Sequence, residues 1–127
     1  MRKQINEYKK SNIRQKSNTK DSYDVINELL RELNSRLKKS LILMEKQSID
    51  KAKENAKKAQ NIAFALQNCL DVKNGGEIAE NLNFLYRHIR FATQSYIEKE
   101  KSDLLSSAHF VSNEILEGWK GMNSAVA

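Results

Sequence analysis

The sequence predicts an all-α fold, an antiparallel up-down-up-down four-helix bundle with a flexible N-terminal arm. The main observation is that apolar residues recur at seven-residue spacing in four separate stretches, which places them along one face of each helix. A second observation is that the 127 residues include no Pro and only 4 Gly, so few positions interrupt a helix. Because short links join long helices, consecutive helices are expected to run antiparallel.

Charge divides the chain into an arm and a body. Residues 1–20 hold seven Lys or Arg and one acidic residue, Glu7, which leaves 15 basic and 15 acidic residues in the remainder. The formal net charge of +6 therefore lies in the arm, whose polar composition buries too little apolar surface to offset the entropy of ordering it. We expect a mobile basic arm at 1–20, the bundle at 21–121 and a C-terminal tail at 122–127.

The first two helices are predicted from their N-caps and their apolar columns. Asp21 or Ser22 can accept hydrogen bonds from the free amides of a first turn, and the second helix begins after Ser48. The first helix has one polar residue, Ser40, on its core face, whereas the second presents mainly small side chains that let a neighbour approach closely. The expected core residues are Val25, Ile26, Leu29, Leu30, Leu33, Leu37, Leu41 and Met44 in the first helix and Ile49, Ala52, Ala56, Ala59, Ala63, Leu66 and Leu70 in the second.

Two glycines mark the break before the third helix. Gly75 and Gly76 can adopt the left-handed backbone that ends a helix, and Glu77 then lies in a first turn, where the helix dipole favours negative charge. The fourth helix is expected from Ser102, another N-cap, to Gly121. The expected core residues are Ile78, Leu82, Leu85, Ile89, Ala92 and Tyr96 in the third helix and Leu104, Leu105, Ala108, Val111, Ile115 and Trp119 in the fourth.

No group of residues in the sequence is arranged for catalysis. A di-iron site in a four-helix bundle needs Glu-x-x-His pairs, but Leu85 and Ser106 stand three residues before His88 and His109. The single cysteine, Cys69, lies beside an apolar column and is expected to be buried. We therefore expect no enzyme activity, no metal and no cofactor. No stretch approaches the roughly 20 apolar residues of a membrane span, so we expect a cytoplasmic protein without direct membrane insertion.

The third helix carries more aromatic residues than a closed core needs. Phe84 and Phe91 lie seven residues apart beside the core column, and Tyr86 lies on the flank. One interpretation is a thick core in which these side chains are partly buried. The other is an exposed apolar groove that binds a partner helix. The spacing leaves both interpretations open.

The most specific pattern in the chain lies between the second and third helices. Leu70 and Asp71 are followed by a short linker, then by Gly-Gly-Glu-Ile-Ala-Glu-Asn-Leu ending at Leu82, and then by Leu85 and Tyr86. This pattern resembles the central motif of the flagellar export chaperone (FliS) family. The similarity extends over about residues 22–121 and includes Ile49–Ala52, Lys58–Ile62 and Trp119–Lys120, with a weaker match at Ile5 and Tyr8.

The resemblance implies a helical bundle that binds the disordered C-terminal segment of flagellin, prevents its premature polymerisation and supports its delivery to the flagellar type III export apparatus. An export-gate component is a second candidate partner, and a homodimer is a candidate state without the client. Ile5 and Tyr8 share one helical face in the arm, which suggests that the arm covers the groove until the client displaces it. The candidate partner-binding residues are Ile5, Tyr8, Asn81, Phe84, Leu85, Tyr86 and Phe91.

Two other classes of function are compatible with the composition. A nucleic-acid-binding bundle would use the basic arm for phosphate contacts, but the arm has one aromatic residue, Tyr8, for stacking and the body is neutral. A structural protein would bury the strip of Phe84 and Phe91 against a second copy of itself. The export chaperone without nucleic-acid binding is the leading hypothesis, and these two are the alternatives.

Overall fold

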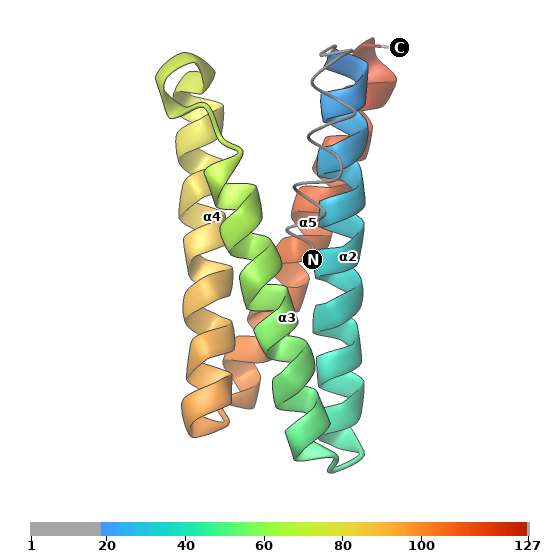
Figure 1. Cartoon of the computed structure of the whole chain (residues 1–127), viewed down its shortest axis with the longest axis vertical. Helices are drawn as coiled ribbons and strands as arrows, with labels where there is room; N and C mark the ends of the chain where they lie inside the picture. The colour runs from blue at the N-terminus through green and yellow to red at the C-terminus, as the bar shows by residue number, and fades with distance from the viewer. Residues whose placement is uncertain (1–18, 127) are drawn as a thin grey trace.

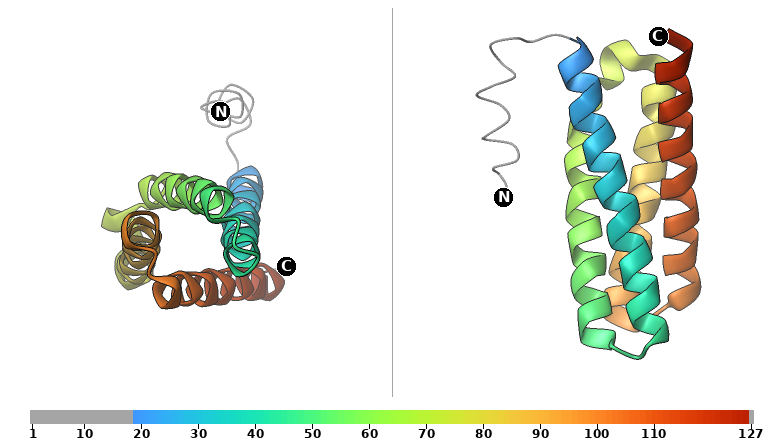
Figure 2. Two further views of the ribbon diagram at one scale, coloured as in Figure 1. Left: turned by 90° about the horizontal axis from the view of Figure 1, so that it is seen from below. Right: turned by 90° about the vertical axis from the view of Figure 1, so that its right-hand side faces the viewer.

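The computed structural model describes residues 19–126, with side chains for residues 23–71 and 75–121. Four helices make up this part of the chain: α2 (Thr19–Glu45), α3 (Ile49–Asn68), α4 (Val72–Lys99) and α5 (Ser102–Val126). They run alternately up and down (Figure 1), which confirms the predicted all-α four-helix bundle. Seen along the bundle axis, the helices form a ring in which α2 packs against α3 and α5, and α4 packs against the same two helices (Figure 2).

The core lies where the predicted apolar columns meet. Most of the predicted positions are buried, and partly buried neighbours such as Ile26 and Leu82 pack against them. Ser40 is fully buried, and its hydroxyl donates a hydrogen bond of 2.7 Å to the backbone carbonyl of Ala52. A buried hydroxyl with a partner costs little free energy, so the one polar residue predicted in this column belongs to the core. The residues with no exposed surface include Leu30, Leu33, Leu37, Ile89, Ala92, Leu105 and Ala108.

Helix α3 contributes small side chains to the core. Ala52, Ala56, Ala59 and Ala63 are all fully buried, and Leu66 follows them on the same face. Alanines at this spacing let the backbone of α3 lie close to α2 and α4, as predicted. The bulk of the core therefore comes from the other three helices.

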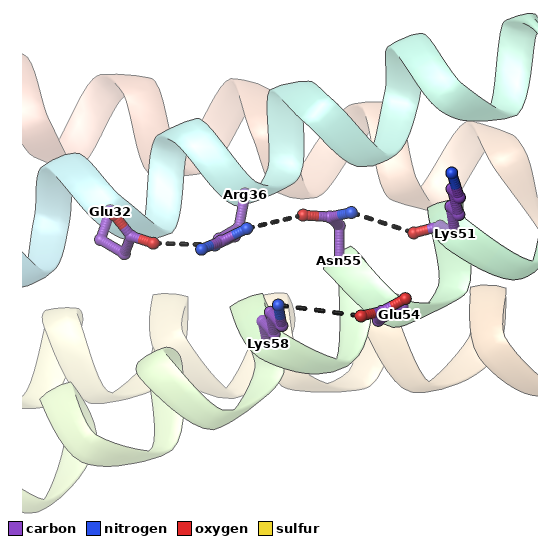
Figure 3. Close-up of polar contacts among 6 residues, drawn as sticks. All are labelled: Glu32, Arg36, Lys51, Glu54, Asn55 and Lys58. Carbon is purple, nitrogen blue, oxygen red and sulfur yellow. Dashed lines mark hydrogen bonds and ion pairs between the residues drawn. The ribbon is translucent and has the colours of Figure 1, made fainter. Parts of the chain in front are cut away.

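Polar side chains fix how adjacent helices are aligned along the bundle. Arg36 of α2 donates to the Asn55 amide oxygen of α3 at 3.0 Å (Figure 3). The Asn34 amide donates to the Ser112 hydroxyl of α5 at 3.0 Å, and His88 Nε2 lies 3.0 Å from the hydroxyl of Ser107 across α4 and α5. Because each bond has a defined length and direction, it disfavours sliding of one helix along another.

Tight links close the end of the bundle where α2 meets α3 and α4 meets α5. Gln47 and Glu100 have positive φ angles of 64° and 54°. After α2, the N–H of Ser48 donates to the carbonyl of Leu43 at 2.8 Å, and after α4, the N–H of Glu100 donates to the carbonyl of Tyr96 at 2.8 Å. Helix C-cap bonds of this kind usually use glycine. Gln47 and Glu100 take that position here, so no glycine marks either link in the sequence.

The link between α3 and α4 is built differently. Helix α3 ends at Asn68, and the backbone leaves the helical region at Gly76, with φ 59° and ψ −138°, so the regular part of α4 begins at Glu77 as predicted. A Cβ added at Gly75 would lie 2.6 Å from the Cβ of Ala79. The two glycines are therefore required for different reasons, Gly76 for its backbone angles and Gly75 for its lack of a side chain.

Two predicted helix ends differ from the structure. Helix α2 begins at Thr19, before the expected caps, and α5 does not end at Gly121 but continues to Val126. A glycine that ends a helix needs a left-handed backbone with a positive φ. Gly121 does not have a positive φ, so the helix continues past it. The expected tail at 122–127 is thus helical as far as the structure describes it, and residues 1–18 of the expected arm lie outside the described part.

The alanine face of α3 should be intolerant of larger side chains. We expect Ala59→Leu to lower the free energy of unfolding by about 1–3 kcal/mol, because the added atoms have no space in a closely packed core. Chemical denaturation followed by circular dichroism measures this. Ala65→Leu is the matched control, since Ala65 is exposed on the same helix and surface changes usually stay within about 0.5 kcal/mol. Equal stability of the two variants would show that α3 is loosely packed.

Substitution by alanine should have opposite effects on stability at Gly75, in the α3–α4 link, and at Gly118, in the middle of α5. We expect Gly75→Ala to destabilise the protein by about 1–3 kcal/mol, because the new methyl group overlaps Ala79. Gly118→Ala should instead stabilise it by roughly 0.5–1 kcal/mol, since Gly118 is helical with open space around it. Thermal denaturation of both variants tests the pair, and a stabilised Gly75→Ala protein would contradict the proposed close contact.

Candidate partner-binding site

The outer face of α4 carries two exposed aromatic side chains. Phe84 is 66% exposed and Phe91 is 62% exposed. They lie seven residues apart, which places them on one face two turns apart. Two further aromatic residues are exposed, Phe64 of α3 at 49% and Phe110 of α5 at 64%. Of the two interpretations left open by the sequence, exposure is therefore the correct one for Phe84 and Phe91.

The other predicted site residues of α4 do not all share this exposure. Asn81 is exposed. Leu85 is partly buried against the core, and Tyr86 is only 2% exposed within it. Burial of Tyr86 raises the pKa of its hydroxyl. Of the two interpretations left open by the sequence, burial is therefore the correct one for Tyr86, because its position on the helix turns the side chain into the core.

A second apolar surface lies inside the bundle, at the end that holds the α3–α4 link. A cleft of about 320 Å³ opens there between all four helices. Ile78 belongs to its wall and is 63% exposed, so its predicted burial is wrong. At this end, α3 and α4 lie apart from α2 and α5 (Figure 1). Apolar residues of α4 that were expected in the core, Ile78 and Leu82, therefore line the opening. The cleft is lined by Ile26, Leu66, Cys69, Leu70, Asp71, Gly75, Ile78, Ala79, Leu82, Tyr86 and Trp119.

Trp119 forms the α5 wall of the cleft. Its ring stacks on Tyr23 of α2 with centroids 4.9 Å apart and planes 10° from parallel. The Tyr23 hydroxyl donates to the backbone carbonyl of Trp119 at 3.1 Å. The indole Nε1 is buried and has no hydrogen-bond partner among the described residues. A buried N–H normally finds an acceptor, and none of the described residues supplies one.

Cys69 lies at the rim of the cleft, at the C-terminus of α3. It is exposed, so the predicted burial is wrong, because the chain leaves the helix before the next core position. Enough protein nevertheless surrounds the sulfur that burial raises the pKa of the thiol. A raised pKa lowers the fraction of reactive thiolate at neutral pH.

The groove between α3 and α4 on the outside of the bundle has a charged lining. A hollow of about 360 Å³ lies between Gln60 of α3 and the α4 residues Arg87, Arg90, Phe91 and Gln94. The Arg90 guanidinium lies 4.7 Å above the centre of the Phe64 ring, and its Nη1 donates to the Gln67 side-chain oxygen at 2.9 Å. We call the surface of Phe64, Phe84, Arg87, Arg90 and Phe91 the outer α3/α4 face.

Among residues 23–71 and 75–121, the titratable side chains offer no other grouping that points to chemistry. Burial, and to a lesser extent the charge of Lys38, lowers the pKa of His109. In the part of the chain that has described side chains, no three His, Cys, Asp or Glu residues are grouped to hold a metal ion. None of the described helices is long and apolar enough to cross a membrane.

Several residues of these surfaces escaped the sequence analysis. Phe64, like Phe84, is an aromatic residue outside the apolar column of its helix. The same pattern could therefore have identified Phe64 from the sequence. Arg90 could not be identified in this way, because its position over Phe64 depends on the packing of α3 against α4. Ile5 and Tyr8 lie outside the described residues.

Comparisons with known proteins place the chain in one family. The family described as "Flagellar protein FliS" matches residues 4–126. A curated relative from Vibrio cholerae serotype O1, the "Flagellar secretion chaperone FliS", is 25% identical over 119 residues, which cover 94% of this chain and 88% of the relative. No solved structure gives a significant match. With a bundle that leaves two apolar surfaces open and a family match over nearly its whole length, the chain belongs to the FliS family of flagellar proteins.

Proposed function

We propose that this protein is a non-catalytic, cytoplasmic export chaperone that binds the C-terminal segment of flagellin. The observation that carries the proposal is the pair of exposed phenylalanines, Phe84 and Phe91, on the outer face of α4 in a member of a flagellar family. Large exposed aromatic side chains on a soluble bundle favour a partner that covers them. The name of the curated relative, a flagellar secretion chaperone, supports a role in export.

A helical client segment fits the spacing of these side chains. Phe84 and Phe91 are about 10.5 Å apart along the helix axis at 1.5 Å per residue, which is the spacing of apolar residues seven apart on a partner helix. An amphipathic client helix can therefore lie along α4 and cover both rings. Asn81, one turn before Phe84, extends the same strip with a polar group for the client backbone.

The cleft at the end of the bundle offers a second place for client side chains. Its walls are mainly apolar and include Ile26, Ile78 and Trp119. They would remove a large apolar side chain of the client from water. A disordered client loses conformational entropy when it folds on the chaperone, so two apolar surfaces are better than one for useful affinity. Coverage of the client helix would keep it from forming filament contacts before export.

Two further contacts belong to the proposal. The arm residues Ile5 and Tyr8 fall within the family match that begins at residue 4, and we propose that they cover the client surface in the free protein. Delivery of the client requires that a component of the export gate recognise the loaded chaperone. Leu85 and Tyr86 would act indirectly, since their packing in the core fixes the orientation of the exposed face of α4.

The test of the function is a binding experiment with the full chain. The protein is mixed with the C-terminal segment of flagellin from the same organism, and the complex is measured by size-exclusion chromatography with light scattering and by calorimetry. We expect a one-to-one complex that becomes more helical on binding. Failure to bind together with salt-sensitive retention of DNA would favour the nucleic-acid alternative. Failure to bind together with a stable dimer would favour the structural alternative.

A pair of substitutions on α4 separates client binding from folding. We expect Phe91→Ala to weaken flagellin binding about thirtyfold, which corresponds to about 2 kcal/mol for an anchor aromatic. Its stability should stay within about 0.5 kcal/mol of the wild type, because the ring is exposed.

Tyr86→Ala is the matched comparison within the core. We expect it to cost about 3–5 kcal/mol of stability, because it removes a buried aromatic side chain. Denaturation and calorimetry on the two variants measure both quantities. A Phe91→Ala protein that loses stability but keeps full affinity would move this residue from the client surface to the core.

A further inference from the structure

The outer α3/α4 face lies on two helix segments that contain no acidic residue, although Gln94, which lines the hollow, donates a hydrogen bond to the carboxylate of Glu98 just beyond them. From Asn55 to Leu70 in α3, and from Asn81 to Ile97 in α4, the sequence contains no Asp or Glu. These two segments hold four Lys or Arg residues, although the body of the protein as a whole is neutral. The four are Lys57, Lys58, Arg87 and Arg90.

Most of this positive charge has no carboxylate partner. Within α2, the Arg36 guanidinium binds the Glu32 carboxylate at 2.7 Å, and within α3, Lys58 lies 3.8 Å from Glu54 (Figure 3). Arg87 and Arg90 form no ion pair with any described side chain. Guanidinium groups favour bidentate contact with carboxylates, so these two arginines can bind a carboxylate of a partner molecule.

Arg90 is already oriented for such a contact. Stacking on Phe64 and the hydrogen bond to Gln67 hold its side chain in one place, and its Nε atom is buried with no partner in the described part of the chain. Arg87 lies one turn away and is exposed, and both line the hollow beside Phe91. A carboxylate in this hollow would contact the guanidinium groups of both Arg87 and Arg90. The surroundings are partly desolvated, and charge attraction is stronger there than in water.

We propose that the outer α3/α4 face selects an acidic amphipathic helix, with a carboxylate of that helix against Arg87 and Arg90 and its apolar side chains against Phe84 and Phe91. The kind of occupant, a helix-forming protein segment, rests on the proposed function. Arg87 lies between the two phenylalanines in the sequence, so one helix can make both types of contact. The charge then determines which amphipathic segments bind, because a basic helix of the same apolar pattern is repelled.

A protein helix fits this face better than a nucleic acid does. The three cations without a carboxylate partner, Lys57, Arg87 and Arg90, would neutralise few phosphates. Salt-dependent affinity for nucleic acid grows with that number.

Two designed peptides test the proposal without knowledge of the natural client. Both are amphipathic helices with the same apolar residues, one with Glu and the other with Lys on the flanks of the apolar stripe. Their affinities for the full chain are measured by fluorescence anisotropy at low and high salt, and the contacted residues are mapped by amide chemical shifts. We expect the Glu peptide to bind at least about tenfold more tightly than the Lys peptide at low salt, with shifts centred on α3 and α4.

Charge reversal on the protein should reverse this preference. Arg87→Glu is the main variant, because Arg87 is exposed and forms no ion pair with any described residue. We expect Arg87→Glu to lower the affinity for the Glu peptide and to raise the affinity for the Lys peptide. Lys38→Glu is the matched control, since Lys38 is exposed on α2, next to His109 of α5 and away from α3 and α4. It should leave both affinities within about twofold.

The proposal is overturned by equal affinity for the two peptides, by absence of binding, or by shifts centred on other helices. It is also overturned if Arg87→Glu and Lys38→Glu have the same effect, or if a single-stranded oligonucleotide binds this face more tightly than the Glu peptide. The proposed function has a separate readout. If the flagellin segment neither binds nor competes while the Glu peptide does, the charge preference stands and the identity of the client is wrong.

Discussion

The close approach of α3 to its neighbours is the constraint on which the rest of the structure depends. Four fully buried alanines line the core face of this helix. Because they fill little volume, the leucines of α2 and the larger residues of α4 and α5 must fill the interior. Phe64 lies outside the alanine column, on the outer surface, where Arg90 covers its ring. The packing of α3 against α4 thus brings together the residues of the outer α3/α4 face.

The two ends of the bundle differ in how firmly they are closed. At one end, the links at Gln47 and Glu100 complete hydrogen bonds to the preceding helices, and Lys53 of α3 forms an ion pair of 3.0 Å with Glu100. At the other end, the chain turns through Gly75 and Gly76, and the helices separate around a cleft. Apolar positions that would be core elsewhere, such as Ile78, are therefore open to a partner.

Helix α4 separates the two apolar surfaces. Its inner side lines the cleft with Leu82 and Tyr86, and its outer side presents Phe84 and Phe91. A client segment that contacted both surfaces would bury α4 from two sides, which suits a chaperone whose partner folds only on binding. In the proposed charge selection, the arginines beside the outer aromatics would add selectivity to an otherwise general apolar attraction, because apolar contact alone discriminates poorly between amphipathic helices.

The sequence by itself determined the fold class, the core faces and the break at the glycines, because helical periodicity and the backbone freedom of glycine are local properties. It also indicated that α4 carries surplus aromatics, but it could not separate Phe84 from Tyr86, since a shift of two residues around a helix changes which neighbour covers a side chain. Only the tertiary structure decided the exposure of Ile78 and Cys69, which depends on how far the helices separate at one end. It likewise decided the stacking of Arg90 on Phe64, a contact between residues 26 positions apart that no local pattern encodes.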